Sequence, residues 1–408
     1  MNRCILSLLF ICTLEAHGDD WPQWRGPARD GKSSETGLLD KWPAEGPRLL
    51  WQANDLGNGY STPSVADGLV YVICNKDDSN EEVIALSLLD GTRVWATRIG
   101  SVGANRGPQY PGTRSTPTVD GELVYALGSD GDLVCLDSKT GDLEWSKDLP
   151  EDFGGKAGMW AYTESPLVDG DALIVSPGGD ATVVALDKSN GSVIWKSILP
   201  ERDDASYSSP VVATINDTKQ YVFFLSKGAV GLNAETGEPM WRYGKTSDRA
   251  ANVQTPVVEG NFVYTAASRV GGGLVTLARK GEAPEEVYFK QTVPKGMGGT
   301  VLVGDDLFGA SGQTLVCVDF RSGELNWQDR SIGAASLCFA EGKLYLHGED
   351  NTVAMVAANG SEYRELGRVT PPNAPDRGRS KAWTYPVIVD GKLIIRDVGT
   401  IWCYDIRG

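Results

Sequence analysis

The sequence predicts an all-β protein: an eight-bladed β-propeller of four-stranded antiparallel blades, whose ring is closed by an N-terminal strand that pairs into the last blade. Two observations predict this fold class. A hairpin motif that ends in tryptophan recurs along the 408 residues, and glycine makes up 49 of them, about 12% against a usual ~7%. Frequent glycine turns leave little room for long helices. Four short strands in roughly 45 residues have the size of one propeller blade.

The repeated hairpin consists of a strand, a turn that contains glycine, and a return strand that ends in tryptophan. Glycine stands four residues before the tryptophan in all five copies, and Asp or Asn stands eight residues before it in four of them. Asp and Asn bond to the backbone of a turn and glycine accepts a positive φ, so each copy is expected to bring its tryptophan to the same depth. The five copies are residues 84–95, 134–145, 184–195, 230–241 and 316–327.

A second signature, a Ser, Thr or Tyr followed by proline, opens the alternating apolar run that comes before most hairpins, and each such run is typical of a strand. Two further units, near 300–327 and 336–366, lack this signature. The fifth unit has Tyr288 in place of tryptophan, and the seventh has a turn at 358–360 but no tryptophan after it. The opening prolines are Pro63, Pro117, Pro166, Pro210, Pro256 and Pro386, which with the two degenerate units gives eight blades.

The two ends of the repeat region are complementary. The last unit stops at 402–408, where its turn should lead into a tryptophan strand, while residues 48–53 form a tryptophan strand with no hairpin before them. The sequence therefore predicts that this N-terminal strand completes the last blade and leaves no open sheet edge. The propeller is expected to span 47–408, preceded by an N-terminal extension at 19–46.

The first 18 residues have the layout of a secretory signal peptide. Arg3 is positively charged, residues 5–14 are mostly apolar, and Ala16 and Gly18 are the small residues of a cleavage site. The apolar stretch is too short to span a bilayer, and no later segment has 18 uninterrupted apolar residues. We expect an exported, soluble protein, periplasmic or extracellular, without a transmembrane segment. Ile11 precedes Cys12 where a lipoprotein signal has a small residue, which disfavours a lipid anchor.

Charge and histidine content exclude several classes of function. The 38 Lys and Arg against 54 Asp and Glu give a net charge of −16, which disfavours binding to nucleic acid or anionic lipid. The chain has two histidines, of which His17 lies in the signal peptide. A His-rich zinc site cannot form, and a Ser-His-Asp triad would depend on His347 alone. Hydrolase and metalloprotease functions are therefore disfavoured.

The cysteines fit a structural role. Five remain after the signal peptide, none of them in a C-x-x-C pair, so neither a disulfide framework nor a zinc spacing is present in the sequence. Cys135, Cys317 and Cys403 stand at the repeat position that Ala85 and Gly231 occupy in other copies. This position is expected to hold a small buried side chain.

The A-L-D-x-x-T-G-x-x-x-W hairpins resemble the tryptophan-docking motifs of PQQ-type β-propellers (pyrroloquinoline quinone repeats). That family includes quinoprotein alcohol dehydrogenases, the BamB-type outer-membrane assembly factor and many exported bacterial proteins. The resemblance covers about 47–408, and the leader W-P-Q-W-R-G-P at 21–27 with the stretch 160–187 looks like exported proteins of planctomycetes. It implies a fold more specifically than a function, because the hairpin is a packing device.

Two functions from different classes follow from this resemblance. The first is a binding or scaffolding module in the cell envelope, whose partner is an envelope protein or a small anionic or planar ligand. The alternative is a dehydrogenase that oxidises an alcohol or sugar with PQQ and calcium. The sequence lacks the adjacent cysteine pair and the haem-attachment C-x-x-C-H found in many such enzymes. Lyase or glycosidase activity would need paired carboxylates. Whether the protein is an enzyme stays open, and its catalytic residues are unknown.

The loops that lead from each outer strand to the next inner strand share one face of a propeller. Here they are rich in Arg, Lys and aromatic residues, among them Arg106 and Tyr110. Two interpretations are open: exposed loops that are merely polar, or a funnel for a planar or anionic ligand. Arg114 and Lys295 are expected to pair with anionic groups. Six residues at or near inner-strand starts form the candidate site: Arg114, Trp160, Lys295 and Trp383 for a cofactor or ligand, and Glu164 with Asn252 for a cation such as calcium.

Overall fold

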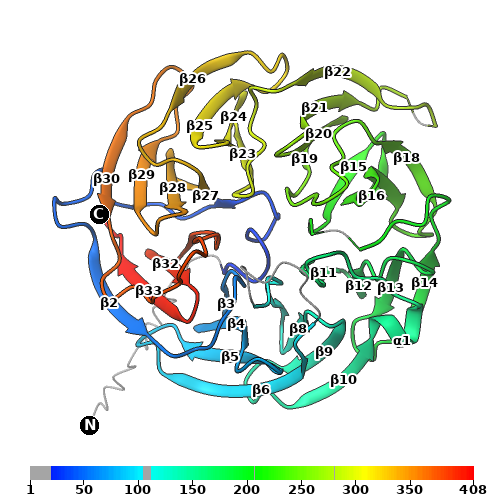
Figure 1. Ribbon diagram of the computed structural model, residues 1–408, viewed down its shortest axis with the longest axis horizontal. Helices are drawn as coiled ribbons and strands as arrows, with labels where there is room; N and C mark the ends of the chain where they lie inside the picture. The colour runs from blue at the N-terminus through cyan, green and yellow to red at the C-terminus, as the bar shows by residue number, and fades with distance from the viewer. Residues whose placement is uncertain (1–19, 104–111, 206, 280) are drawn as a thin grey trace, which may run out of the picture.

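The computed structural model describes residues 20–103, 112–205, 207–279 and 281–408, and within them eight antiparallel sheets surround one axis (Figure 1). The eight-bladed propeller predicted from the sequence is confirmed. The predicted signal peptide at 1–18 lies outside the described residues, as do Arg106 and Tyr110. No helix in the described part of the chain has the length and hydropathy needed to cross a membrane.

Each blade has one strand nearest the axis and one at the rim, and in all but the last blade the four strands run outward in chain order (Figure 1). The first four blades are β3 (Ser64–Ala66), β4 (Leu69–Asn75), β5 (Asn80–Ser87), β6 (Arg93–Ser101); β7 (Thr118–Asp120), β8 (Leu123–Leu127), β9 (Asp132–Asp137), β10 (Leu143–Asp148); β11 (Leu167–Asp169), β12 (Ala172–Val175), β13 (Val183–Asp187), β14 (Val193–Ser197); and β15 (Val211–Ile215), β16 (Thr218–Leu225), β17 (Gly228–Asn233), β18 (Pro239–Tyr243). A short helix, α1 (Leu149–Phe153), follows β10.

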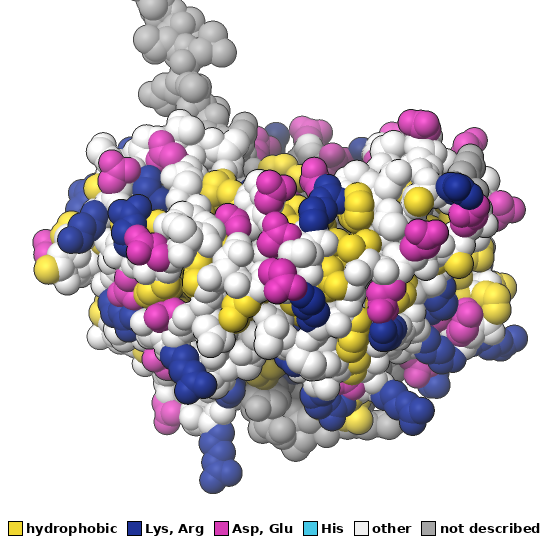
Figure 2. Space-filling view, turned by 90° about the horizontal axis from the view of Figure 1, so that it is seen from above, with side chains coloured by type: hydrophobic (Ala, Val, Ile, Leu, Met, Phe, Trp, Pro, Cys, Tyr) yellow, Lys and Arg dark blue, Asp and Glu magenta, His cyan; other side chains and the backbone are white. Residues whose placement is uncertain are grey.

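Charged side chains of both signs are interspersed over the side of the ring (Figure 2). The remaining four blades also run outward from the axis to the rim. Their strands are β19 (Val257–Glu259), β20 (Phe262–Ala267), β21 (Gly271–Thr276), β22 (Glu285–Lys290); β23 (Thr300–Val303), β24 (Asp306–Ser311), β25 (Thr314–Asp319), β26 (Leu325–Asp329); β27 (Ala335–Ala340), β28 (Lys343–Gly348), β29 (Val353–Ala357), β30 (Glu365–Val369); and β31 (Val387–Val389), β32 (Lys392–Asp397), β33 (Thr400–Asp405), β2 (Arg48–Ala53).

The predicted closure of the ring is confirmed. Strand β2 pairs antiparallel with β33 and becomes the outermost strand of the last blade, with Trp51 opposite Cys403. The blue and red strands lie side by side in Figure 1. Because the first strand of the ring is thus held by the last, the ring is joined by backbone hydrogen bonds as well as by side-chain packing.

The tryptophans join neighbouring blades. Trp145 of the second blade lies against Gly191 in the hairpin of the third, and its indole Nε1 donates to the carbonyl oxygen of Lys188 at 3.0 Å. Gly191 has a φ of 71°, and a Cβ there would lie 2.8 Å from the indole ring. The same Gly contact recurs for Trp51, Trp95, Trp195 and Tyr288, so the repeated motif is an interblade contact.

The small repeat position lies directly across the sheet from the tryptophan. Cys135 is paired with Trp145, and Cys317 and Cys403 hold the same place in their blades. All five described cysteines are buried and free, as expected for small apolar residues. Where the tryptophan is absent the position is larger: it is Leu274 opposite Tyr288.

Blade seven receives its missing tryptophan from the N-terminal extension. Gly367 stands in β30 at the tryptophan position, opposite Met355. Trp42 covers this glycine: its backbone N–H donates to the carbonyl oxygen of Leu366 at 3.0 Å, and its ring centroid lies 6.2 Å from that of Tyr345. Blade two has a similar ring distance, 6.1 Å, between its own tyrosine and tryptophan. Trp42 is buried, and the extension therefore belongs to the folded ring.

Residues 21–33 of the extension, here called the axial strap, cross the centre of the ring, where they form the dark blue segment of Figure 1. Strand β1 (Lys32–Ser33) in the strap pairs in parallel with β27. Arg25 and Arg29 are both 2% exposed, and Arg29 donates hydrogen bonds to backbone carbonyls of two blades. The strap contacts all eight blades, at Val65, Val119, Pro166, Pro210, Thr255, Thr300, Phe339 and Tyr385.

Candidate functional site

A cavity of about 250 Å³, here called the axial cavity, lies on the axis of the ring next to the strap. Trp24 of the strap forms part of its wall, and the other lining residues come from the loops that lead into the inner strands of seven blades. The wall is mostly apolar and contains six aromatic side chains: Trp24, Tyr60, Trp160, Tyr207, Trp383 and Tyr385. An apolar cavity with few polar groups is the usual form of a small-molecule site.

The lining follows a rule of register. Six lining residues stand three positions before the proline that opens an inner strand: Tyr60, Arg114, Thr163, Tyr207, Val253 and Trp383. The residue two positions before each proline is absent from the described lining. Side chains alternate in extended backbone, so one position faces the axis and the next faces into the blade. This register produces the cavity.

The aromatic rings of the wall contact one another in pairs. The centroids of Tyr60 and Trp383 are 5.4 Å apart, and those of Trp160 and Tyr207 are 6.4 Å apart. Trp24 meets Tyr385 edge to face at 4.7 Å, and its indole Nε1 donates to Thr255 Oγ1 at 2.8 Å. Each ring is thus held by a neighbour, which makes the wall of the cavity well defined.

Arg114 is the charged member of the described lining of the axial cavity. Its guanidinium lies over the ring of Tyr60, with Cζ 5.5 Å from the ring centroid, and donates to the carbonyl oxygen of Gly112 at 3.1 Å. Burial lowers the pKa of Arg114 from its ordinary value. A cation against an aromatic face in an apolar cavity can pair with one anionic group of a ligand.

Glu349 orients Trp383. The indole Nε1 donates to Glu349 Oε1 at 3.0 Å, and Lys381 Nζ forms an ion pair with Oε2 of the same carboxylate at 2.5 Å. The sequence reasoning missed Glu349, which lies in blade seven far along the chain from Trp383. It also missed Tyr60 and Tyr207, although their spacing of three residues before a proline is the same as that of Arg114 and Trp383.

The structure brings three of the six candidate residues together. Arg114, Trp160 and Trp383 all line the axial cavity, while Lys295 lines an adjoining cavity that shares Trp160 with it. Their assignment to a cofactor stays a prediction. Lys295 Nζ donates to Gln291 Oε1 at 3.0 Å.

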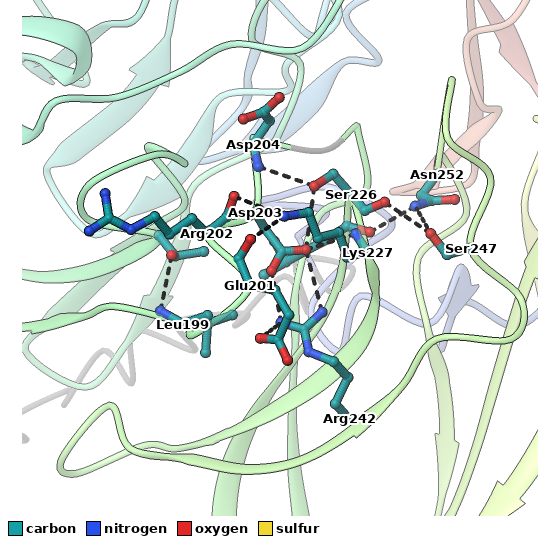
Figure 3. Close-up of polar contacts among 12 residues, drawn as sticks. Leu199, Glu201, Arg202, Asp203, Asp204, Ser226, Lys227, Arg242, Ser247 and Asn252 are labelled. Carbon is teal, nitrogen blue, oxygen red and sulfur yellow. Dashed lines mark hydrogen bonds and ion pairs between the residues drawn. The ribbon is translucent and has the colours of Figure 1, made fainter.

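The two candidate metal ligands lie apart and face into their blades. Glu164 is 2% exposed, and its carboxylate accepts from Ser176, including the backbone N–H at 2.8 Å. Burial raises the pKa of Glu164 to about 7. Asn252 donates from Nδ2 to the carbonyl oxygen of Leu225 at 2.7 Å and to Ser247 Oγ at 3.2 Å (Figure 3). Within the described residues, no three His, Cys, Asp or Glu side chains are grouped to hold a metal ion.

Comparisons with known proteins match both the repeat and the ring. The family model described as outer membrane protein assembly factor BamB matches residues 79–329. BamB of Yersinia pestis is 33% identical over 92 residues, and BamB of Escherichia coli K12 is 29% identical over 92 residues. The matched part spans 22% of this chain and 22% of those relatives.

Two solved structures share the fold. The crystal structure of BamB from Moraxella catarrhalis has a TM-score of 0.63 at 13% identity, covering 88% of this chain and 97% of that one. Quinohemoprotein alcohol dehydrogenase from Comamonas testosteroni has a TM-score of 0.68 at 13% identity, covering 95% of this chain and 81% of the other. These likenesses show the propeller alone. Because the family model matches more than half of the chain, the protein belongs to the BamB family of PQQ-repeat β-propellers.

Proposed function

We propose that this protein is a binding or scaffolding module of the cell envelope, and that the axial cavity is where it holds a ligand or an apolar group of a partner. The observation that carries the proposal is the wall of six aromatic rings with Arg114 among them. Such a wall offers a large apolar surface with one group that selects for negative charge. The strap and the closure of the ring make this surface rigid, so little ordering is needed on binding.

The envelope location and the partner are part of this proposal. The predicted signal peptide supports export, and the relatives in the family are named as outer membrane protein assembly factors. The net charge of −16 disfavours contact with anionic lipid, whereas the apolar cavity on the axis offers a place for a ligand or for an apolar group of a partner.

Binding of a neutral aromatic probe tests the proposal. We expect 3-(2-naphthyl)propanamide to bind the wild-type protein in isothermal titration calorimetry, and the Trp383→Ala variant to bind it at least about tenfold more weakly, because about 1.4 kcal/mol of ring contact is lost. Leu89→Ala, at an 82% exposed side chain on the rim, is the matched control and leaves the affinity unchanged. If the wild type does not bind the probe, or if Trp383→Ala and Leu89→Ala bind it with equal affinity, the axial cavity is refuted as the site.

A PQQ- and calcium-dependent dehydrogenase is the second candidate function, and the likeness to quinohemoprotein alcohol dehydrogenase over 95% of the chain favours it. The aromatic wall fits the planar ring of PQQ. The fit is incomplete for its three carboxylates and for calcium, because the described lining of the axial cavity offers one cation, Arg114, and no carboxylate or amide side chain. Glu164 and Asn252 face into their blades.

Titration with PQQ separates the two functions. The binding-module proposal expects no calcium-dependent reduction of a dye when the protein, PQQ, calcium and a series of alcohols or sugars are combined. Calcium-dependent turnover that is lost in Arg114→Gln would establish the dehydrogenase and overturn the binding module.

A further inference from the structure

We propose that a second cavity beside the axial cavity is the other half of one elongated ligand site, and that it takes an anionic group, a carboxylate or phosphate, attached to the apolar group in the axial cavity. This inference rests on the proposed function. The second cavity, here called the side cavity, has a volume of about 220 Å³. Trp160, Ala251, Val253 and Met297 line both cavities, so a ligand can extend from one to the other across shared walls.

The side cavity differs from the axial cavity in its polar groups. It lies at the fifth blade, beside the loops that lead into the fifth and sixth blades. Its described lining includes Asp248, Gln254, Arg269 and Lys295, and Trp160 is the one aromatic residue in it. The two cavities together therefore present a compartment with an aromatic wall and, in contact with it, one that carries charged side chains. This arrangement fits an amphipathic ligand better than two independent ligands.

The charges of Asp248 and Arg269 are already compensated. Arg269 donates from Nε to Asp248 Oδ2 at 2.8 Å and from NH2 to Oδ1 at 2.6 Å, a bidentate pair. Asp248 is 7% exposed and also accepts from the backbone N–H of Ala250 at 2.8 Å. A bidentate pair of this kind is fixed in geometry and contributes no net charge to the cavity.

Lys295 gives the side cavity its net charge. Its ammonium donates to a neutral oxygen, Gln291 Oε1, at 3.0 Å, and Lys295 is not among the lysines that form ion pairs in the described part of the chain. The strongest interaction open to this ammonium is therefore with an anionic group of a ligand. A cationic group of a ligand is disfavoured, because the described lining of the side cavity has two cations, Lys295 and Arg269, and one carboxylate, Asp248.

A pair of probes that differ in one charge tests the inference. 3-(2-Naphthyl)propanoate has the same naphthyl group as the neutral propanamide but ends in a carboxylate. We expect the wild-type protein to bind the propanoate at least about tenfold more tightly than the propanamide at low ionic strength, where charge pairs are least screened. Lys295→Gln should remove most of this preference and leave the affinity for the propanamide within about twofold of the wild type, since one net charge is lost while Arg114 and the apolar contacts remain.

Two controls make the outcomes decisive. Lys139→Gln removes the same charge at a side chain that is 69% exposed, in the turn between β9 and β10 of the second blade. This variant should leave the preference intact. If the preference persists in Lys295→Gln and is lost in Arg114→Gln, the anionic group binds in the axial cavity and the side cavity is refuted while the binding module stands. If the wild type binds the propanamide but shows no preference for the propanoate, the inference fails alone. If neither probe binds, the proposed function fails with it.

Discussion

Replacing Trp42 with alanine tests whether the N-terminal extension is part of the folded ring. Trp42 is 3% exposed, and its Nε1 has no hydrogen-bond partner in the described structure, so the loss is one of apolar contact. A buried aromatic side chain covers about 150–250 Å², which at about 25 cal/mol per Å² corresponds to about 4–6 kcal/mol. Measured truncations of buried aromatic residues cost about 3–5 kcal/mol. We therefore expect Trp42→Ala to lower the free energy of unfolding by about 4 kcal/mol.

Urea denaturation followed by tryptophan fluorescence and circular dichroism measures this loss. Leu89→Ala is the control, because a side chain that is 82% exposed should change the free energy of unfolding by less than about 0.5 kcal/mol. A loss below about 1 kcal/mol in Trp42→Ala would refute the reasoning. It would mean that Gly367 and Tyr345 stabilise blade seven without the extension.

Two further predictions concern the blades. Burial raises the pKa of Glu164 from 4.5 to about 7, so between these pH values the unfolded chain has released the proton while the folded protein keeps it. As the pH rises through this interval, the wild type should therefore lose up to about 3 kcal/mol of stability relative to Glu164→Gln. Urea unfolding of both proteins at about pH 4 and about pH 8 measures the change, and a pH-independent difference contradicts it. Gly191→Ala should destabilise by about 1–3 kcal/mol more than Gly170→Ala. Both glycines have positive φ, but only at Gly191 would the Cβ meet Trp145; equal unfolding free energies contradict this contact.

The repeat made the ring predictable from the sequence, including its degenerate members. Tyr288 takes the tryptophan position in blade five, and residues 48–53 complete the last blade. The axial strap was not predictable, because its residues occur once and have no period. Trp42 gave no signal for the same reason: nothing in the sequence next to it marks Gly367, more than 300 residues away, as its contact.

The sequence was sufficient to predict which face of the propeller carries the candidate site. Arg114, Trp160 and Trp383 lie in loops that any propeller gathers at one end, and the structure gathers them around one cavity. Which side of the backbone a residue occupies is a finer property. Glu164 stands one residue after the lining residue Thr163, and this single step turns its carboxylate into the blade toward Ser176. A register count from the opening proline distinguishes the two positions, whereas nearness to a strand start does not.

The axial strap has a consequence for the order in which the protein is made. A ribosome synthesises residues 21–33 early, yet two of their contacts, Phe339 and Tyr385, are synthesised only after roughly 300 further residues. Until then the early tryptophans and arginines have no complete binding place. A chain whose synthesis stops before the seventh blade therefore lacks these two contacts, and part of its early segment stays exposed.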